Sequence, residues 1–92
     1  MKIGILGYGT VASGLVDIID NNKDKRDISI EGILVRDVSK HAHRKHADVL
    51  TSDIEDIFNK DVDVIVELLG GLHPSYEYLK RALENKINVV TA

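Results

Sequence analysis

The stretch "KIGILGYGTVASGL", residues 2–15, decides the fold of this chain. Ile3 to Leu6 form a short apolar run that is typical of a strand, and from Thr10 the apolar residues recur at helical spacing. This helix is expected to end near residues 21–22, with its apolar positions at i, i+4, i+7 and i+8: Val11, Leu15, Ile18 and Ile19. A strand that runs through a glycine turn into a helix predicts the first half of a βαβ unit.

The turn itself, Gly7 to Ala12, matches the pattern G-x-G-x-x-G/A with alanine in the third place. In a βαβ unit Gly7 would permit the tight turn, Gly9 would let the backbone approach a pyrophosphate, and Ala12 would keep the helix close to the sheet. The N–H groups of residues 9–12, at the positive end of the helix dipole, would hold that anion. The alternative is that the two glycines only make a tight turn. Strand, spacing and helix together favour a dinucleotide phosphate.

Gly14 follows the motif by two residues. We expect it on the inward face of the helix, beside Val11 and Ile18, where it would serve packing and not a ligand.

Beyond this unit the chain continues to alternate strands and helices. Apolar runs predict further strands at residues 28–35, 49–50, 62–69 and 88–91. Helices are expected from Ser39, over residues 54–58 and from Pro74, the last with a buried stripe at Tyr76, Leu79, Leu83 and Ile87. This order predicts a Rossmann-like, doubly wound α/β fold, whose parallel sheet has its first strand in the centre and is truncated after about five strands. Residues 1–92 are therefore interpreted as one incomplete domain.

The composition excludes several classes of function. The chain has 92 residues and no cysteine, so it has neither disulfides nor a thiol nucleophile. A net charge of −3 argues against general nucleic-acid binding, which needs a basic surface. No apolar run approaches the roughly 20 residues that cross a membrane, and no signal peptide is evident, so a cytoplasmic location is expected.

The end of the second strand bears on the choice of dinucleotide. At this place an acidic residue bonds the ribose 2′-OH of NAD, whereas an arginine accommodates the 2′-phosphate of NADP. The sequence has Arg36 followed by Asp37, which favours NADP and leaves NAD open. In a helix, Arg36, Lys40 and Arg44 would align three cations along one side. For Lys40 and Arg44, a solvated charged face without a ligand is the favoured interpretation.

The end of the fourth strand, "VELLGGLHP" at residues 66–74, is the second place where a cofactor could lie. Leu69, Gly70 and Gly71 would pass near its ribose or nicotinamide, although the glycines could equally serve only to let the chain leave the sheet. Glu67 stands inside the apolar strand, and a buried carboxylate needs a partner. Backbone N–H groups and a ribose hydroxyl both remain open as that partner.

Histidines are the other residues with chemical potential. His41, His43 and His46 are close enough in sequence for a metal site, but a polar helix with no evident carboxylate to orient them favours a solvated face. His73 is expected to cap the following helix, with an approach to the cofactor as the alternative. We find no pattern typical of a catalytic triad, a carboxylate pair or a lysine in apolar surroundings.

The segments "GILGYGTVASGL", "ILVRDVSK", "LTSDIEDI" and "DVDVIVELLGGLHPSYEYLKRALENKINVVTA" resemble the N-terminal nucleotide-binding part of homoserine dehydrogenases. That family interconverts aspartate-4-semialdehyde and homoserine by hydride transfer with NADH or NADPH, in the biosynthesis of threonine, isoleucine and methionine. The resemblance implies cofactor contacts at these residues: Gly7, Tyr8, Gly9, Thr10, Val11, Arg36, Leu69, Gly70, Thr91 and Ala92. It also implies a homodimeric parent enzyme.

The sequence departs from that family in two places. Ala12 stands where the family commonly has glycine, which the G/A rule tolerates. The "TA" of residues 91–92 is normally followed by "NK", whose lysine is a proposed proton donor, and then by the domain that binds the semialdehyde and forms the dimer. We therefore expect the 92 residues alone to bind cofactor weakly without turning over homoserine. The strand at residues 88–91 would leave an open edge inclined to pair with another chain.

Two alternatives stay open beside this resemblance. One is a stand-alone nucleotide-binding or regulatory module without catalysis. The other is part of a different semialdehyde or amino-acid dehydrogenase with a similar fold, because fold alone does not separate these activities.

Overall fold

A computed structural model of the chain describes residues 1–22, 27–69 and 75–91. Its sheet has five parallel strands in the order β3-β2-β1-β4-β5, so the expected central place of the first strand is confirmed. The strands are β1 (Lys2–Leu6), β2 (Ser29–Leu34), β3 (Leu50–Thr51), β4 (Val64–Glu67) and β5 (Asn88–Thr91). This is the order expected for a Rossmann-like sheet, and the doubly wound α/β fold is confirmed.

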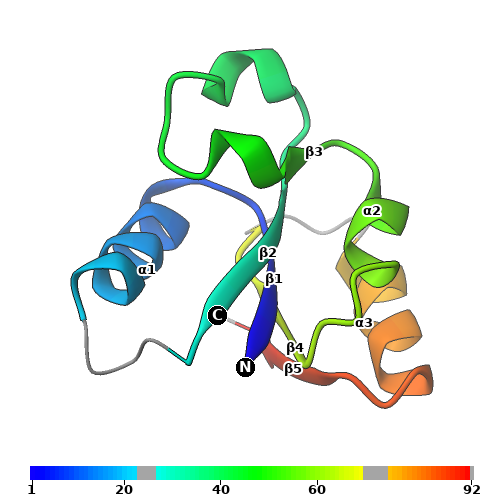
Figure 1. Ribbon diagram of the computed structural model, residues 1–92. Coiled ribbons are helices and arrows are strands. Elements are labelled where there is room, and N and C mark those ends of the chain that lie inside the picture. The colour runs from blue at the N-terminus through cyan, green and yellow to red at the C-terminus, as the bar shows by residue number, and fades with distance from the viewer. Residues whose placement is uncertain (23–26, 70–74, 92) are drawn as a thin grey trace.

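Helices cover both faces of the sheet (Figure 1). They are α1 (Thr10–Asn21), the 3-10 turns η2 (Val38–His41) and η3 (Ala47–Val49), α2 (Ile54–Phe58) and α3 (Ser75–Glu84). Helix α1 lies on one face, and α2 and α3 lie on the other. Within the described ranges 1–22, 27–69 and 75–91, no helix has both the length and the apolar character needed to cross a bilayer.

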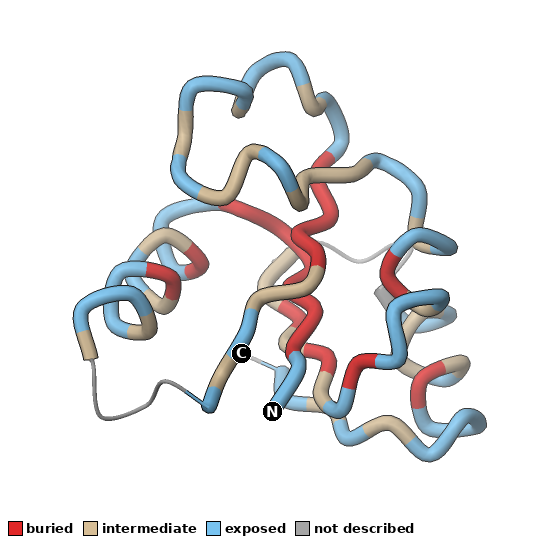
Figure 2. Tube along the Cα trace, in the orientation of Figure 1, coloured by how far each residue is buried: buried red, intermediate tan, exposed pale blue. Residues whose placement is uncertain are grey.

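The apolar core is divided by the sheet, and its buried residues follow the central strands (Figure 2). Ile3 and Ile5 of β1 pack with Ala12 and Val16 of α1, whereas Leu6 packs on the opposite side. Successive residues of a strand point to opposite faces, so β1 contributes to both halves of the core. Burial on both faces is what its continuous apolar sequence predicts.

Helix α2 approaches the sheet closely because two glycines lie beneath it. Gly4 of β1 and Gly32 of β2 are register partners. A Cβ on Gly4 would stand 2.7 Å from Cγ2 of Ile57, and a Cβ on Gly32 would stand 2.9 Å from its Cγ1. Ile57 is fully buried over this pair. The two glycines therefore leave the space on the sheet that the Ile57 side chain of α2 occupies.

The inward faces of α1 and α3 differ from the sequence prediction. In α1 the buried residues are Ala12 and Val16, whereas Val11 and Ile18 are 65% and 63% exposed. Gly14 has nothing within 4 Å of the place where a Cβ would stand, so its expected packing role is wrong. The physical reason is that the small side chain of Ala12 lets α1 pack closely against the sheet. The face of α1 that contacts the sheet therefore centres on Ala12 and Val16, and Val11 lies outside it.

Helix α3 shows the same kind of shift. Tyr76 and Leu83, expected in the buried stripe, are 69% and 64% exposed, and Ala82 is fully buried instead. Tyr78 and Ile87 pack partly buried against the same cluster. In both helices an alanine is fully buried in the core, and its methyl group permits closer packing than a larger side chain would.

The helix expected from Ser39 is absent from the described segment, which forms η2 and η3 instead. Asp37, and not Ser39, is the N-cap of η2, and its carboxylate accepts a hydrogen bond from the Ser39 N–H at 3.0 Å. His46 before η3 has a φ of 63°, which interrupts helical geometry. This polar segment lacks the apolar stripe that stabilises a surface helix, and contacts with the first βα turn hold it in another shape.

Candidate functional site

The glycine turn lies at the carboxyl edge of the sheet, between the ends of β2 and β4. The Gly7 N–H donates to the carbonyl oxygen of Leu34 at 2.8 Å, and the Leu68 N–H donates to the carbonyl oxygen of Leu6 at 2.9 Å. Ligands of open α/β sheets bind at this edge, beside the strand where the order reverses. The backbone therefore brings together the two segments in which the sequence predicts cofactor contacts.

Gly7 is required by its conformation and by its neighbour. Its φ is 101°, a region that side chains with a Cβ rarely adopt, and a Cβ there would stand 3.0 Å from the carbonyl oxygen of Leu68. The first glycine of the motif thus permits both the tight turn and the close passage of the chain that leaves β4.

Gly9 stands in a different environment from Gly7. It is the N-cap of α1 with φ −85° and ψ −157°, which any residue adopts, and no atom of the described residues lies within 4 Å of the place where a Cβ would stand. Among the same residues no side chain caps this helix end, and its first turn holds no acidic residue. Gly9, Thr10 and Val11 are exposed. The folded chain does not need glycine at this position, whereas a pyrophosphate resting on these N–H groups would need the open space.

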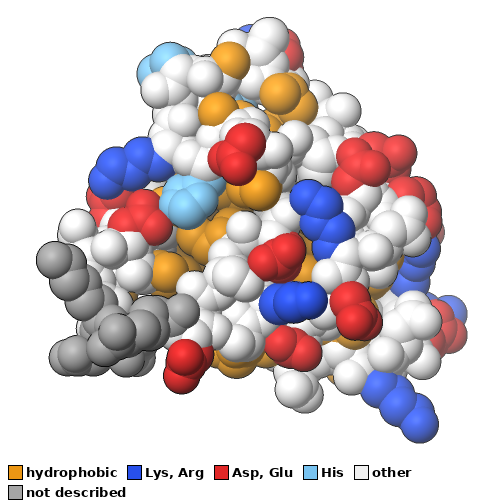
Figure 3. All heavy atoms as spheres, in the orientation of Figure 1, with side chains coloured by type: hydrophobic (Ala, Val, Ile, Leu, Met, Phe, Trp, Pro, Cys, Tyr) orange, Lys and Arg blue, Asp and Glu red, His pale blue; other side chains and the backbone are white. Residues whose placement is uncertain are grey.

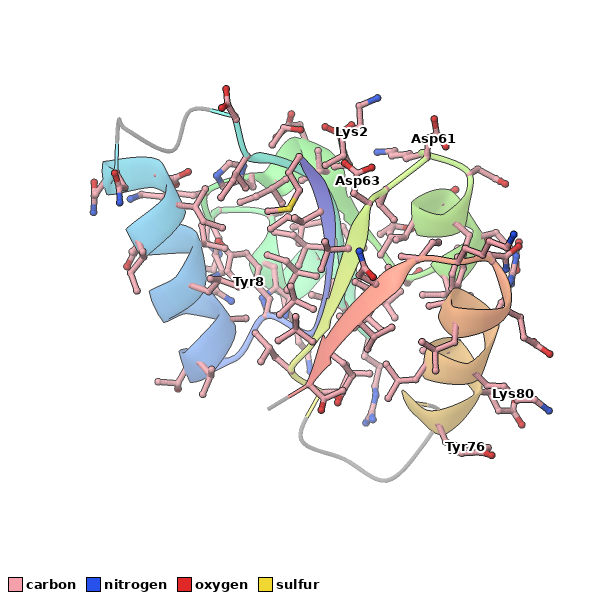
Figure 4. All side chains as sticks on the ribbon, turned by 90° about the horizontal axis from the view of Figure 1, so that it is seen from below. Lys2, Tyr8, Asp61, Asp63, Tyr76 and Lys80 are labelled. Atoms are coloured by element: carbon pink, nitrogen blue, oxygen red, sulfur yellow. The ribbon has the colours of Figure 1, made fainter. Side chains whose placement is uncertain are left out.

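Tyr8 points away from this exposed surface and is 6% exposed (Figure 4). Its hydroxyl donates to the carbonyl oxygen of Lys45 at 3.0 Å, and its ring stacks with His41 at 5.9 Å between centroids. The guanidinium carbon of Arg44 stands 3.5 Å from the ring centroid. Only the backbone of Tyr8 is therefore left for the predicted cofactor contact.

Arg44 makes contacts at the glycine turn that sequence reasoning missed. Its Nη1 donates to the carbonyl oxygen of Tyr8 at 2.6 Å, and its Nη2 donates to the Ser13 hydroxyl. The solvated charged face favoured for Arg44 is therefore wrong, and so is the expected alignment of Arg36, Lys40 and Arg44 along one helix. Lys40 is exposed, as that interpretation expects. The aromatic residue inside the glycine motif was the signal that could have suggested a stacked arginine.

Arg36 stands two residues beyond the end of β2 and is exposed. Among the described residues its guanidinium makes no hydrogen bond or ion pair. Asp37 has its Oδ1 engaged by the N–H of Ser39 at 3.0 Å and by its hydroxyl at 2.6 Å. These hydrogen bonds hold the pKa of the Asp37 carboxyl below its usual value. At the strand end that discriminates between dinucleotides, the arginine is open and the aspartate caps a turn.

Glu67 is buried, and its Oε2 accepts a hydrogen bond from the Leu69 N–H at 2.8 Å. Of the two partners left open by the sequence, a backbone N–H group is thus shown. The carboxylate fixes the chain where β4 ends, and Thr91 of β5 lies opposite Glu67 in the register. Leu69 and Thr91 therefore share the carboxyl edge with the glycine turn.

Some predicted residues fall outside the part of the chain that the structure describes. They are Gly70, Gly71, His73, Pro74 and Ala92.

The histidines of the polar segment have separate partners. His41 stacks on Tyr8, and Nε2 of His46 lies 2.9 Å from Oδ1 of Asp20. A carboxylate does orient His46, contrary to the expectation from the sequence. His43 is exposed. In residues 1–22, 27–69 and 75–91, no three metal-ligating side chains converge.

A polar hollow lies at the opposite, amino edge of the sheet. Its lining comes from the turns before β4 and β5 and includes Asp61, Asp63, Asn85 and Lys86. Figure 4 shows Asp61 and Asp63 near Lys2 at the start of β1, far along the sheet from the β4 end. On the face seen in Figure 3, acidic and basic side chains are interspersed. The hollow lies at the edge that open α/β sheets do not use for ligands, so we assign it no role.

The chain is similar to known proteins over almost its whole length. Residues 7–92 match the family model described as the NAD binding domain of homoserine dehydrogenase. The homoserine dehydrogenase of Bacillus subtilis is 38% identical over 103 residues, which cover 100% of this chain and 23% of that protein. The protein of the same name from Synechocystis is 36% identical over 98 residues and is also covered to 23%.

Solved structures show the same relationship. A crystal structure of Staphylococcus aureus homoserine dehydrogenase superposes with a TM-score of 0.88 at 43% identity, covering 100% of this chain and 26% of that one. The enzyme from Thiobacillus denitrificans gives a TM-score of 0.87 at 30% identity, covering 99% of this chain and 23% of that one. The chain thus spans about a quarter of the length of the relatives that it matches. It belongs to the homoserine dehydrogenase family and corresponds to that family's NAD-binding domain.

Proposed function

We propose that the chain binds a nicotinamide dinucleotide with its pyrophosphate on the N–H groups at the start of α1. The observation that carries this proposal is the open space beside Gly9. No contact among the described residues requires glycine at this position. The uncapped helix end supplies donors and a positive dipole, and no acidic residue of its first turn opposes an anion. Gly7, Tyr8, Gly9, Thr10 and Val11 would contact the phosphates through their backbone or by close approach.

We infer that NADP is preferred over NAD. An exposed guanidinium forks onto phosphate, and Arg36 stands where the adenosine ribose would lie. Asp37, the residue that could instead bond a ribose hydroxyl, has one carboxylate oxygen engaged by Ser39. Leu69, Gly70, Thr91 and Ala92 would line the ribose and nicotinamide end of the same site.

The whole protein is proposed to be a cytoplasmic, homodimeric homoserine dehydrogenase that interconverts aspartate-4-semialdehyde and homoserine. The bound nicotinamide would supply the hydride, and the residues of this chain would position it. The chain spans about a quarter of the length of its relatives, so we expect the 92 residues alone to bind cofactor without oxidising homoserine. Homoserine oxidation by the purified 92-residue protein would contradict the expectation that these residues alone do not turn over homoserine.

The proposal is tested by titrating the protein with NADH and NADPH before and after Arg36→Ala. Loss of a charge-assisted hydrogen bond is expected to weaken NADPH binding by about 1–3 kcal/mol, with NADH binding almost unchanged. Equal losses for both cofactors would contradict the role of Arg36. No binding of either cofactor by the unaltered protein would contradict the proposed function itself.

A further inference from the structure

The segment between β2 and β3 is attached to the glycine turn by a group of contacts that centres on Arg44. Its guanidinium donates on one side to the Tyr8 carbonyl oxygen and on the other to the Ser13 hydroxyl. His41 adds a third partner, with its Nδ1 at 2.9 Å from Nη1 of Arg44. The arginine is half-buried, and the Tyr8 ring beneath it is almost wholly buried.

The two residues that Arg44 bonds flank the proposed anion-binding segment in the sequence. Tyr8 immediately precedes Gly9, and Ser13 immediately follows Ala12. Arg44 therefore joins the two ends of the segment whose N–H groups, in residues 9–12, are proposed to hold the pyrophosphate. A hydrogen bond from the Ser13 N–H to the Gly9 carbonyl oxygen at 2.9 Å closes the same turn.

We propose that Arg44 is a positioning residue for the cofactor pyrophosphate. It fixes the Tyr8 carbonyl group relative to the first turn of α1, so that the N–H groups between them keep one arrangement. Its guanidinium bonds the residues at both ends of this segment, and the positive charge would favour an anion there. This inference rests on the proposed function of dinucleotide binding.

The role of Arg44 differs in kind from that of Arg36. The pyrophosphate is common to NADH and NADPH, whereas the 2′-phosphate is present only in NADPH. Arg44 therefore acts on both cofactors alike, and Arg36 acts on one. Lysine is expected to replace Arg44 only in part, because a single ammonium lacks the planar fork that bonds two acceptors while stacking on a ring.

Arg81 offers a matched control in the same chain. Its guanidinium carbon stands 4.3 Å from the Phe58 ring centroid, and its Nη2 bonds Glu55 at 2.6 Å. It thus combines the same charge, ring stacking and hydrogen bonding as Arg44, but it joins α3 to α2 on the other face of the sheet. Loss of Arg81 tests the effect of a weakened fold without a change at the glycine turn.

The experiment measures the dissociation constants of NADH and NADPH for Arg44→Ala, Arg44→Lys and Arg81→Ala, with the urea midpoint of each variant. Arg44→Ala is expected to lower the affinity for NADH and for NADPH by the same factor, about tenfold or more. Arg44→Lys is expected to restore only part of that affinity. Arg81→Ala is expected to lower the urea midpoint and to leave both constants unchanged. The amide NMR signals of residues 9–12 should shift in Arg44→Lys but not in Arg81→Ala.

Three results would overturn the inference. The first is an unchanged affinity for both cofactors in Arg44→Ala. The second is a loss of affinity confined to NADPH, which would make Arg44 a ligand of the 2′-phosphate. The third is an equal loss of affinity in Arg44→Ala and Arg81→Ala. If the unaltered protein binds both cofactors in any of these cases, only the role of Arg44 fails. Absence of binding by the unaltered protein overturns the proposed function instead.

Discussion

The carbonyl oxygen of Leu68 lies 3.0 Å from the place where a Cβ on Gly7 would stand. This closeness joins the first turn of the chain to the segment that leaves β4, and both border the proposed cofactor site. Gly7→Ala is therefore expected to destabilise the fold by about 1–3 kcal/mol, because alanine is strained at a φ of 101° and meets backbone atoms. Urea denaturation measures this change, and an unaltered midpoint would contradict the close approach.

Gly9→Ala is expected to have the opposite profile. The position has an ordinary extended φ and an open side, so the unfolding free energy is expected to change by less than about 1 kcal/mol. The added methyl group would occupy the space proposed for the pyrophosphate and lower the affinity for NADH and NADPH together. Calorimetric titration decides the point, and full affinity in Gly9→Ala would place the phosphates elsewhere.

Gly4→Ala and Gly32→Ala test the close contact between α2 and the sheet. Each new methyl group would stand within 3.0 Å of Ile57, so we expect a loss of about 1–3 kcal/mol of stability from overpacking. Combining either change with Ile57→Ala, which removes both Cγ1 and Cγ2 of Ile57, is expected to cost less stability than the sum of the two single changes. Strictly additive losses in denaturation experiments would show that the glycines and Ile57 do not meet.

The ion pair between Glu55 and Arg81 predicts a dependence of stability on pH. Hydrogen bonding to Arg81 lowers the pKa of the Glu55 carboxyl, so its stabilising contribution is present above the ordinary carboxyl pKa. That contribution is lost as the pH falls through the lowered value. In Glu55→Gln the corresponding part of the acid unfolding curve should disappear. Identical pH profiles for the two proteins would contradict a pair that persists in solution.

Local pattern was sufficient to predict the βαβ unit at which the candidate site lies. The spacing of apolar residues changes from strand-like to helical within the few residues from Gly7 to Thr10. The order of the strands in the sheet follows from the alternation of strands and helices. Helix α2, expected over residues 54–58, was predictable for the same reason, and Asp53 caps it by accepting a hydrogen bond from the Glu55 N–H at 3.0 Å.

Contacts between distant segments were not predictable. Tyr8 and Arg44 are 36 residues apart, and their contact helps to give the polar segment a shape that its own composition does not specify. The buried faces of α1 and α3 differ from the predicted faces because each centres on a small apolar residue, Ala12 or Ala82. Periodicity counts such residues weakly, although close packing depends on them.

The most direct test of the central claim is an amide NMR titration of the isotope-labelled protein with NADPH. The account predicts that the largest shifts occur at the start of α1, in Gly9, Thr10 and Val11, and at Arg36. Signals of Asn85 and Lys86, which line the hollow at the amino edge, should stay in place. Shifts centred on that hollow, or none at saturating NADPH, would contradict a dinucleotide site at the carboxyl edge.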